Sequence, residues 1–165
     1  MRTLSMAGGL AALAILLSAC GGSAASSDAL ATQHEADLYH VTQIERGWHE
    51  ATSRQDIDLM MSLWAPDATF TVASGETLTG KDAIRGFWLK APVFQPANHW
   101  VSETPAYKLK ATVNGDKGTL YFECHYVDPK TKLVKAVTAA DQQVARIDGQ
   151  WLITNNVGAA PLLTP

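Results

Sequence analysis

Hydrophobic residues in the first half of the chain follow the period of an α-helix. Apolar side chains recur at spacings of three or four residues in three segments, which predicts helices near residues 38–51, 56–64 and 81–91. The stripe in the first segment consists of Leu38, Val41, Ile44, Trp48 and Ala51. Pro66 ends the second segment and Pro92 ends the third, because proline cannot continue a helix.

The second half of the chain has the pattern of β-structure. We expect a first strand at residues 68–73 and later strands near residues 98–103, 107–113, 119–127, 133–147 and 151–157. The run 133–147 is longer than an ordinary strand, which predicts a bulge or bend inside it. Helices early and strands late favour an α+β fold, with the helices on one face of a curved antiparallel sheet.

The first residues have the layout of a secretory signal peptide. Arg2 precedes an apolar run at residues 7–17, which is well short of the roughly 20 residues that span a bilayer. The sequence Leu17-Ser18-Ala19-Cys20 resembles the lipobox of bacterial lipoproteins, in which the cysteine becomes the lipidated first residue of the mature chain. A plain secreted protein cut near the same place is the alternative.

The lipobox reading divides the chain into three parts. We expect a lipoprotein signal peptide at residues 1–19, a lipidated Cys20 with a flexible tether at residues 20–34, and one domain at residues 35–160. The lipid would attach the protein to a membrane of the cell envelope, facing the periplasm or the exterior. Once Cys20 carries the lipid, Cys124 would have no second cysteine in the chain with which to form a disulfide. This favours a buried free thiol at Cys124 that packs as a small apolar residue.

Composition narrows the classes of partner. The 165 residues are 47% hydrophobic and 18% charged, which is typical of a folded domain rather than a disordered chain. The formal net charge of −3 argues against nucleic acid, whose phosphates need a basic face. His34, His40 and His49 are spaced by six and nine residues, so they do not form a helical metal pair. We expect neither a metal nor a cofactor.

Three segments of the chain resemble the SnoaL-like domains of the nuclear transport factor 2-like superfamily. Residues 54–70 (RQDIDLMMSLWAPDATF) resemble the helix–turn–strand signature, residues 80–88 (GKDAIRGFW) the third helix, and residues 148–153 (DGQWLI) the last hairpin. The resemblance implies a cone-shaped curved sheet packed against three helices, enclosing a pocket for a small, mostly apolar molecule. Members of the family often dimerise through the outer face of the sheet, so the resemblance also leaves a homodimer of this kind open.

The family includes both enzymes and members without chemistry, so the fold does not fix the function. In the isomerase pattern a carboxylate base works with a tyrosine and a second acid. The resemblance places Val72 at the position of the base and Trp48 at that of the tyrosine. Because valine cannot transfer a proton, these replacements argue against isomerase chemistry.

The third catalytic position falls near Asp141, although counting back from the Asp148-Gly149 turn places it nearer Gln143. Asp141 is the candidate pocket acid, and a structural aspartate is the alternative. If the two long strands pair so that residue numbers sum to an even value of about 260, Asp141 shares a face with the side chains of Tyr121, Glu123 and His125; an odd sum separates them. Scytalone dehydratase, of the same superfamily, uses such a tyrosine, histidine and aspartate set.

Two functions remain open at this point. The first is a lipid-anchored domain that binds a small apolar ligand or a partner protein without catalysis. The second is a cofactor-independent acid–base enzyme of the cyclase, dehydratase or isomerase type, with Asp141 and His125 as catalytic residues. The replaced catalytic positions favour the first. The candidate ligand-binding residues are the aromatic side chains Trp48, Phe70, Phe87, Trp88, Trp100, Tyr107 and Tyr121.

Overall fold

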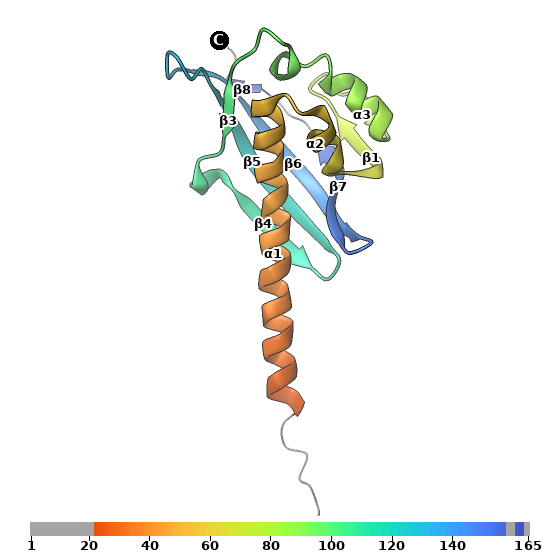
Figure 1. Cartoon of the computed structure of the whole chain (residues 1–165). Helices are drawn as coiled ribbons and strands as arrows, with labels where there is room; N and C mark the ends of the chain where they lie inside the picture. The colour runs from red at the N-terminus through yellow and green to blue at the C-terminus, as the bar shows by residue number, and fades with distance from the viewer. Residues whose placement is uncertain (1–21, 158–160, 164–165) are drawn as a thin grey trace, which may run out of the picture.

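The computed structural model describes residues 22–157 and 161–163. The expected signal peptide and the lipidated Cys20 lie outside these residues. In the described part of the chain, three α-helices lie against one face of a curved β-sheet (Figure 1). The predicted α+β class, with helices on one side of a curved sheet, is confirmed.

The sheet contains one departure from the predicted antiparallel arrangement. Its strands run in the order β2-β1-β7-β6-β5-β3, with β4 paired to β5 and β8 paired to β6. Strand β1 lies parallel to β7, whereas the other pairs are antiparallel. The strands are β1 (Trp64–Thr71), β2 (Thr77–Thr79), β3 (Val101–Glu103), β4 (Lys110–Asn114), β5 (Lys117–Val127), β6 (Val134–Ile147), β7 (Gln150–Val157) and β8 (Pro161–Leu163).

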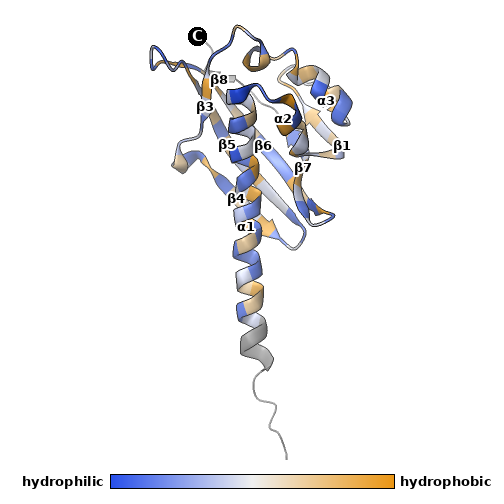
Figure 2. Ribbon diagram, in the orientation of Figure 1, coloured by the Kyte–Doolittle hydropathy of each residue, from blue (hydrophilic) through white to orange (hydrophobic). Residues whose placement is uncertain are grey.

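Helix α1 (Gly22–Arg54) packs across the sheet with the predicted stripe. The side chains of Val41, Ile44, Trp48 and Ala51 are at most 3% exposed. Hydrophobic and hydrophilic residues alternate along this helix (Figure 2), as expected where one face is buried. No helix in the described ranges is both long and apolar enough to cross a membrane.

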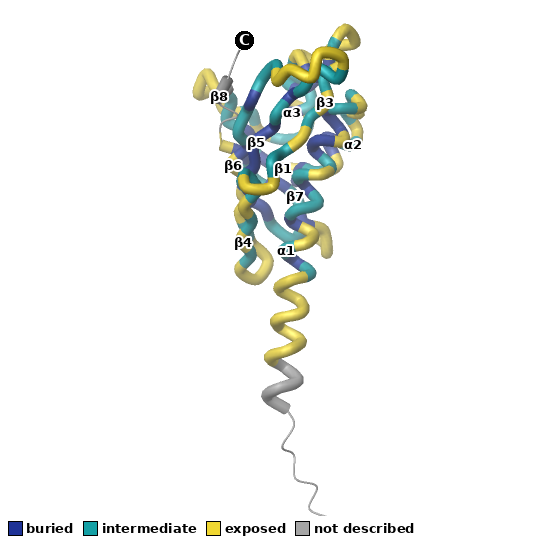
Figure 3. The backbone as a smooth tube through the Cα atoms, turned by 90° about the vertical axis from the view of Figure 1, so that its left-hand side faces the viewer, coloured by how far each residue is buried: buried dark blue, intermediate teal, exposed yellow. Residues whose placement is uncertain are grey.

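The N-terminal part of α1 extends beyond the domain. Residues 27–35 are exposed and project past the sheet (Figure 3). The composition of this segment had predicted a flexible tether, but in the structure residues 22–34 belong to the helix. We call residues 22–35 the stalk; at 1.5 Å per residue it is about 21 Å long.

A short helix lies between α1 and the first strand. Helix α2 (Ile57–Ser62) is capped as its sequence suggests, since the carboxylate of Asp56 accepts a hydrogen bond from the backbone N–H of Leu59 at 2.9 Å. Strand β1 begins at Trp64, which the pattern had placed in the preceding helix. Trp64 pairs with Ile153 of β7 and is fully buried, so both arrangements put its side chain in the core.

The remaining short elements lie between β2 and β4. Helix α3 (Lys81–Trp88) packs against β1, and two 3-10 turns, η1 (Pro92–Phe94) and η2 (Ala106–Lys108), follow it on either side of β3. The turn η2 replaces the start of the strand predicted at residues 107–113.

The pairing of β5 with β6 decides which side chains face the helices. Tyr121 lies opposite Asp141, so paired residue numbers sum to 262, the even case. We call the face toward the helices the inner face and the opposite one the outer face. From β5 the inner face receives the buried residues Leu120, Phe122, Cys124 and Tyr126. A register shift between β6 and β7 after Gln143 confirms the predicted irregularity in the long strand.

Gly118 lies at a point where β5 approaches β4 closely. A Cβ atom at this position would lie 2.4 Å from the backbone oxygen of Thr112, whereas a Cβ at Gly86 in α3 would meet nothing within 4 Å. We expect Gly118→Ala to reduce the free energy of unfolding by about 1–3 kcal/mol. Gly86→Ala should instead raise it by about 0.5–1 kcal/mol, because alanine favours helix. Urea denaturation measures both, and equal effects of the two variants would contradict the close approach of β4 to β5 at Gly118.

Candidate functional site

An aromatic cluster fills the space between the inner face and the helices. The indole rings of Trp48 from α1 and Trp88 from α3 meet edge to face, with centroids 5.0 Å apart. Trp88 stacks on Phe70 of β1 at 5.9 Å, and Phe70 contacts Phe87 at 4.9 Å. The ring of Trp64 lies 5.9 Å from that of Trp48. Five aromatic side chains from three elements therefore form one continuous apolar cluster in the interior.

A surface depression opens beside this cluster, between the β1–β2 turn and α3. It consists of two hollows of about 260 Å³ and about 340 Å³, both lined by Val72 and Phe87. Phe70 forms part of the wall of the smaller hollow, and Gly86 and Lys90 line the larger one. This β1–α3 depression connects the protein surface with the aromatic cluster.

Two amides lie next to the cluster on the inner face. Gln142 of β6 and Asn156 of β7 are directly paired across the two strands and are 1% and 0% exposed. Neither nitrogen nor oxygen of either amide has a hydrogen-bond partner among the described residues, and the indole nitrogens of Trp64 and Trp88 are also unpartnered there. Buried polar groups are nearly always paired, so this set marks an unusual place in the core.

The two ionisable groups that β5 buries on the inner face are poor acids and bases. Cys124 and Tyr126 are buried on β5. Burial raises the pKa of the Cys124 thiol to about 12 and raises that of the Tyr126 phenol well above its ordinary value. Both groups therefore stay neutral near pH 7. The buried thiol of Cys124 is as predicted.

His49 is the buried histidine beside the cluster, and both of its ring nitrogens are occupied. Its Nδ1 lies 2.5 Å from Ser102 Oγ, and its Nε2 lies 2.5 Å from Thr104 Oγ1 and 3.0 Å from Glu45 Oε1. Burial opposes ionisation of Glu45, but the hydrogen bond and charge of His49 outweigh it, so the pKa of Glu45 is lowered. The contacts join α1 to β3 and the segment after it, which indicates a structural histidine.

A second polar cluster lies on the outer face, around Glu123. Its carboxylate accepts hydrogen bonds from Lys108 Nζ at 2.8 Å, from Tyr121 Oη at 3.1 Å and from His125 Nε2 at 3.3 Å. The Glu123 side chain is only 8% exposed. The hydrogen bond from Lys108, with those from His125 and Tyr121, holds the pKa of Glu123 below its ordinary value. A carboxylate with both oxygens engaged is a stable anion rather than a proton acceptor.

The candidate catalytic residues lie on this outer face. Asp141 is exposed opposite Tyr121, and His125 contacts Glu123, so the expected position of Asp141 inside a pocket is wrong. Because successive strand residues point to opposite faces, the neighbouring Gln142 is the β6 side chain that enters the core. Counting back from the Asp148-Gly149 turn identified the correct part of β6, but Gln143, the residue it reached, lies on the outer face.

The candidate ligand-binding residues separate into two groups. Trp48, Phe70, Phe87 and Trp88 meet in the aromatic cluster. The others lie elsewhere: Trp100 packs on Tyr126 at 6.4 Å and lines a separate hollow with His99, Tyr107 is 76% exposed, and Tyr121 is on the outer face. Ligand binding by any of these residues stays a prediction. Sequence reasoning missed Gln142 and Asn156, whose inward direction depends on the strand register.

Comparison with known proteins identifies the family. Residues 46–153 match the family model of the SnoaL-like domain. The chain belongs to the SnoaL-like domain family. No curated protein sequence matches it. In this SnoaL-like domain, Val72 lines the β1–α3 depression and Trp48 lies in the aromatic cluster. The two positions that carry the base and the tyrosine in the isomerase pattern are therefore apolar and face the candidate site.

Solved structures with the same fold support the assignment. A nuclear transport factor 2-like protein with a cystatin-like fold from Novosphingobium aromaticivorans has a TM-score of 0.69 at 16% identity, covering 81% of this chain and 88% of that one. A cystatin-like protein of unknown function from Nostoc punctiforme has a TM-score of 0.66 at 16% identity, with coverages of 78% and 94%. A Streptomyces avermitilis protein provisionally named a dehydratase has a TM-score of 0.62 at 16% identity, with coverages of 79% and 99%.

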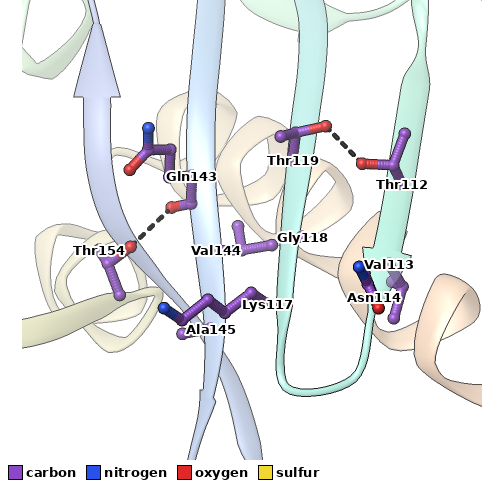
Figure 4. A pocket seen from close by; sticks show the side chains of 10 residues that line it. All are labelled: Thr112, Val113, Asn114, Lys117, Gly118, Thr119, Gln143, Val144, Ala145 and Thr154. Carbon is purple, nitrogen blue, oxygen red and sulfur yellow. Dashed lines mark hydrogen bonds between the residues drawn. The ribbon is translucent and has the colours of Figure 1, made fainter.

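The SnoaL-like domain has a further hollow on its outer face, of about 570 Å³ (Figure 4). Among its polar side chains, Thr112 and Thr119 share a hydrogen bond of 2.7 Å, and Thr154 Oγ1 donates to the backbone oxygen of Gln143 at 3.2 Å. None of the candidate catalytic or ligand-binding residues lines it. Within the described residues, no group of three histidine, cysteine or acidic side chains is placed to hold a metal. The β1–α3 depression with the cluster behind it is therefore the better candidate site.

The Glu123 cluster predicts a component of acid sensitivity. Because the pKa of Glu123 is lower in the folded state than its ordinary value of 4.5, its stabilising contribution is complete above that value and is lost as pH falls through the folded pKa. Glu123→Gln should lower Tm by several degrees at pH 7, and the difference from wild type should shrink toward pH 3. Thermal melts between pH 3 and 7 measure this.

The control is Glu103→Gln, which changes an exposed carboxylate of β3 on the same outer face. We expect its Tm to follow that of the wild type at every pH. A Glu123→Gln deficit that stays constant from pH 7 to pH 3 would show that the ion pairs of Glu123 do not stabilise the fold.

Proposed function

We propose that this SnoaL-like domain binds a small, mostly apolar ligand at the aromatic cluster without transforming it. The observation that carries the proposal is the composition of the site: Phe70 and Phe87 of the aromatic cluster line the depression together with Val72, and the buried amide of Asn156 is paired with Phe70 across β1 and β7. Aromatic side chains with a few oriented polar groups are typical of small-molecule sites.

The ionisable groups near the site support binding rather than catalysis. The pKa values of the Cys124 thiol and the Tyr126 phenol are raised by burial, and the ring nitrogens of His49 already have partners. General acid–base catalysis needs a group that exchanges a proton near the working pH and reaches the substrate. The described residues around the cluster do not offer one.

The alternative is a cofactor-independent acid–base enzyme. The observation in its favour is that Asp141, Tyr121, Glu123 and His125 share the outer face, and a relative with this fold is provisionally named a dehydratase. Such an enzyme would work on the open face of the sheet, where the carboxylate of Glu123 is already saturated with donors. We therefore favour binding of a ligand, or of a partner protein, over catalysis.

The proposal includes a lipid anchor on Cys20 that holds the domain at the cell envelope. Two features support it: the lipobox sequence, and the helix that begins at Gly22, two residues after Cys20, and can serve as a spacer. The stalk would then place the domain about 21 Å from its attachment point. Helix α3, beside the depression, lies toward the end of the domain remote from the start of α1 (Figure 1), so the site would lie at the end of the domain away from the membrane. A homodimer through the outer face remains compatible with this arrangement.

Naphthalene is a suitable probe of the aromatic cluster, because it has an apolar bicyclic frame. We expect it to quench or shift tryptophan fluorescence in a saturable manner, since Trp88 lies within the cluster. Gly86→Leu should weaken this binding tenfold or more, because the new side chain enters the larger hollow, where a Cβ meets nothing within 4 Å.

The matched control is Ala31→Leu, which adds a similar side chain to an exposed position of the stalk. It should leave the naphthalene affinity unchanged. Lack of saturable binding by the wild type, or binding that Gly86→Leu does not weaken, would contradict a ligand site at this position.

The anchor has its own test. Cys20→Ser should abolish incorporation of radiolabelled fatty acid when the full chain is expressed in a bacterial host, because the serine cannot form the thioether of a lipoprotein. Cys124→Ser is the control and should remain labelled. Label that persists in Cys20→Ser would contradict the lipoprotein assignment.

A further inference from the structure

Gln142 and Asn156 form the centre of a row of side chains across four strands of the inner face. Leu120 of β5 is paired with Gln142, Gln142 with Asn156, and Asn156 with Phe70 of β1. Phe70 is also part of the wall of the β1–α3 depression. The amides thus lie one and two strands behind the depression, between a leucine and a phenylalanine.

Hydrogen bonding in this row is incomplete in a way that a structural role does not explain. All four polar atoms of the two amides lack a partner among the described residues, although the two side chains are directly opposite each other and 1% and 0% exposed. A buried amide without partners costs more than a hydrogen bond normally contributes. If these residues served only the fold, apolar side chains such as those of neighbouring Val144 and Ile153 would serve it better.

We infer that these two amides recognise an amide-like edge of the ligand, that is, a hydrogen-bond acceptor adjacent to a donor. This inference rests on the proposed ligand site and names the chemical class that the site takes. Each carboxamide offers one acceptor and a double donor without net charge. The pair therefore matches a neutral lactam, carboxamide or urea group attached to an apolar ring.

The indoles refine this class. Trp64 and Trp88 have N–H groups without a partner in the described part of the chain, and they can only donate. Donors therefore outnumber acceptors among the unpartnered groups of the row and the neighbouring cluster, which favours a ligand edge with a strong acceptor, such as the carbonyl oxygen of a lactam. A hydrocarbon of the same shape would leave the amides unpaired, so it should bind the apolar part of the site but more weakly than the lactam.

The chain itself offers a matched control for this inference. Gln143 and Asn155 are the next residues along the same two strands, and they are also directly paired, but on the outer face. They repeat the residue types and the strand pairing while facing away from the cluster. Leucine at Gln142 and Asn156 removes the inner amides, and leucine at Gln143 and Asn155 removes the outer ones.

The experiment compares 2-quinolinone, which has a lactam edge, with naphthalene, which has the same bicyclic frame without it. We expect Gln142→Leu/Asn156→Leu to weaken 2-quinolinone binding by tenfold or more and to leave naphthalene binding equal or tighter. Gln143→Leu/Asn155→Leu should change neither affinity. Isothermal titration calorimetry of the folded proteins gives all the dissociation constants.

The outcomes separate this inference from the proposed function. In one outcome, naphthalene binds, but Gln142→Leu/Asn156→Leu leaves the affinity for 2-quinolinone unchanged. This result would overturn recognition by the amides and leave the apolar site in place. Absence of binding by both probes would overturn the site itself, and with it the inference.

The melting temperature without ligand provides a second readout. Removing four unpartnered polar atoms should leave Tm of the inner variant equal to or above that of the wild type. A fall in Tm, or failure of the inner variant to fold, would mean that internal water or the fold itself uses the amides, and would overturn the inference.

Discussion

The register between β5 and β6 is the constraint on which the rest of the structure depends. These are the two longest strands, and Tyr121 faces Asp141 across them. Since side chains alternate between faces, this one pairing sends Phe122, Cys124 and Gln142 toward α1 and sends Glu123 and Asp141 outward. A slip of a single residue in β6 alone would exchange Gln142 for Asp141 in the core, at a high cost in desolvation.

Helix α1 packs on the face that this register creates and is fixed to it at two separate places. Near the stalk, Asp37 accepts hydrogen bonds from Arg146 Nη1 at 2.8 Å and from Trp151 Nε1 at 3.2 Å. Burial opposes ionisation of Asp37, but these bonds and the charge of Arg146 outweigh it, and its pKa is lowered. Nearer the end of the helix, His49 bonds to Ser102. Trp48 is thereby held over Phe122, with ring centroids 5.6 Å apart, which closes the inner face.

Local patterns in the sequence predicted most of the long elements, but not the helical stalk or the start of β1 at Trp64. The stripe through Ile44 and Trp48 predicted the buried part of α1, and the length of the run at residues 133–147 predicted an irregular strand. The direction of the side chains at the site could not be predicted in the same way, because it depends on how two strands that are far apart in the sequence align. The sequence left the even and the odd register open, and the observed even register puts Tyr121, His125 and Asp141 on one face. The choice between inner and outer face further requires the helix that covers one of them.

The consequence for function is a division of chemistry between the two faces. Charge gathers on the outer face, where Lys108 and Glu123 neutralise each other under partial solvent access. Around the aromatic cluster the inner face carries groups that stay neutral, such as the amide of Gln142 and the thiol of Cys124. An interior of this kind can distinguish ligands by shape and by hydrogen-bond pattern, and the two carboxylates that α1 brings to this face, Asp37 and Glu45, are already paired with Arg146 and His49. Recognition rather than reaction is therefore the function that we propose for this interior, and an enzyme with the isomerase pattern would first need an ionisable side chain at one of the positions now occupied by Val72, Trp48 and Gln142.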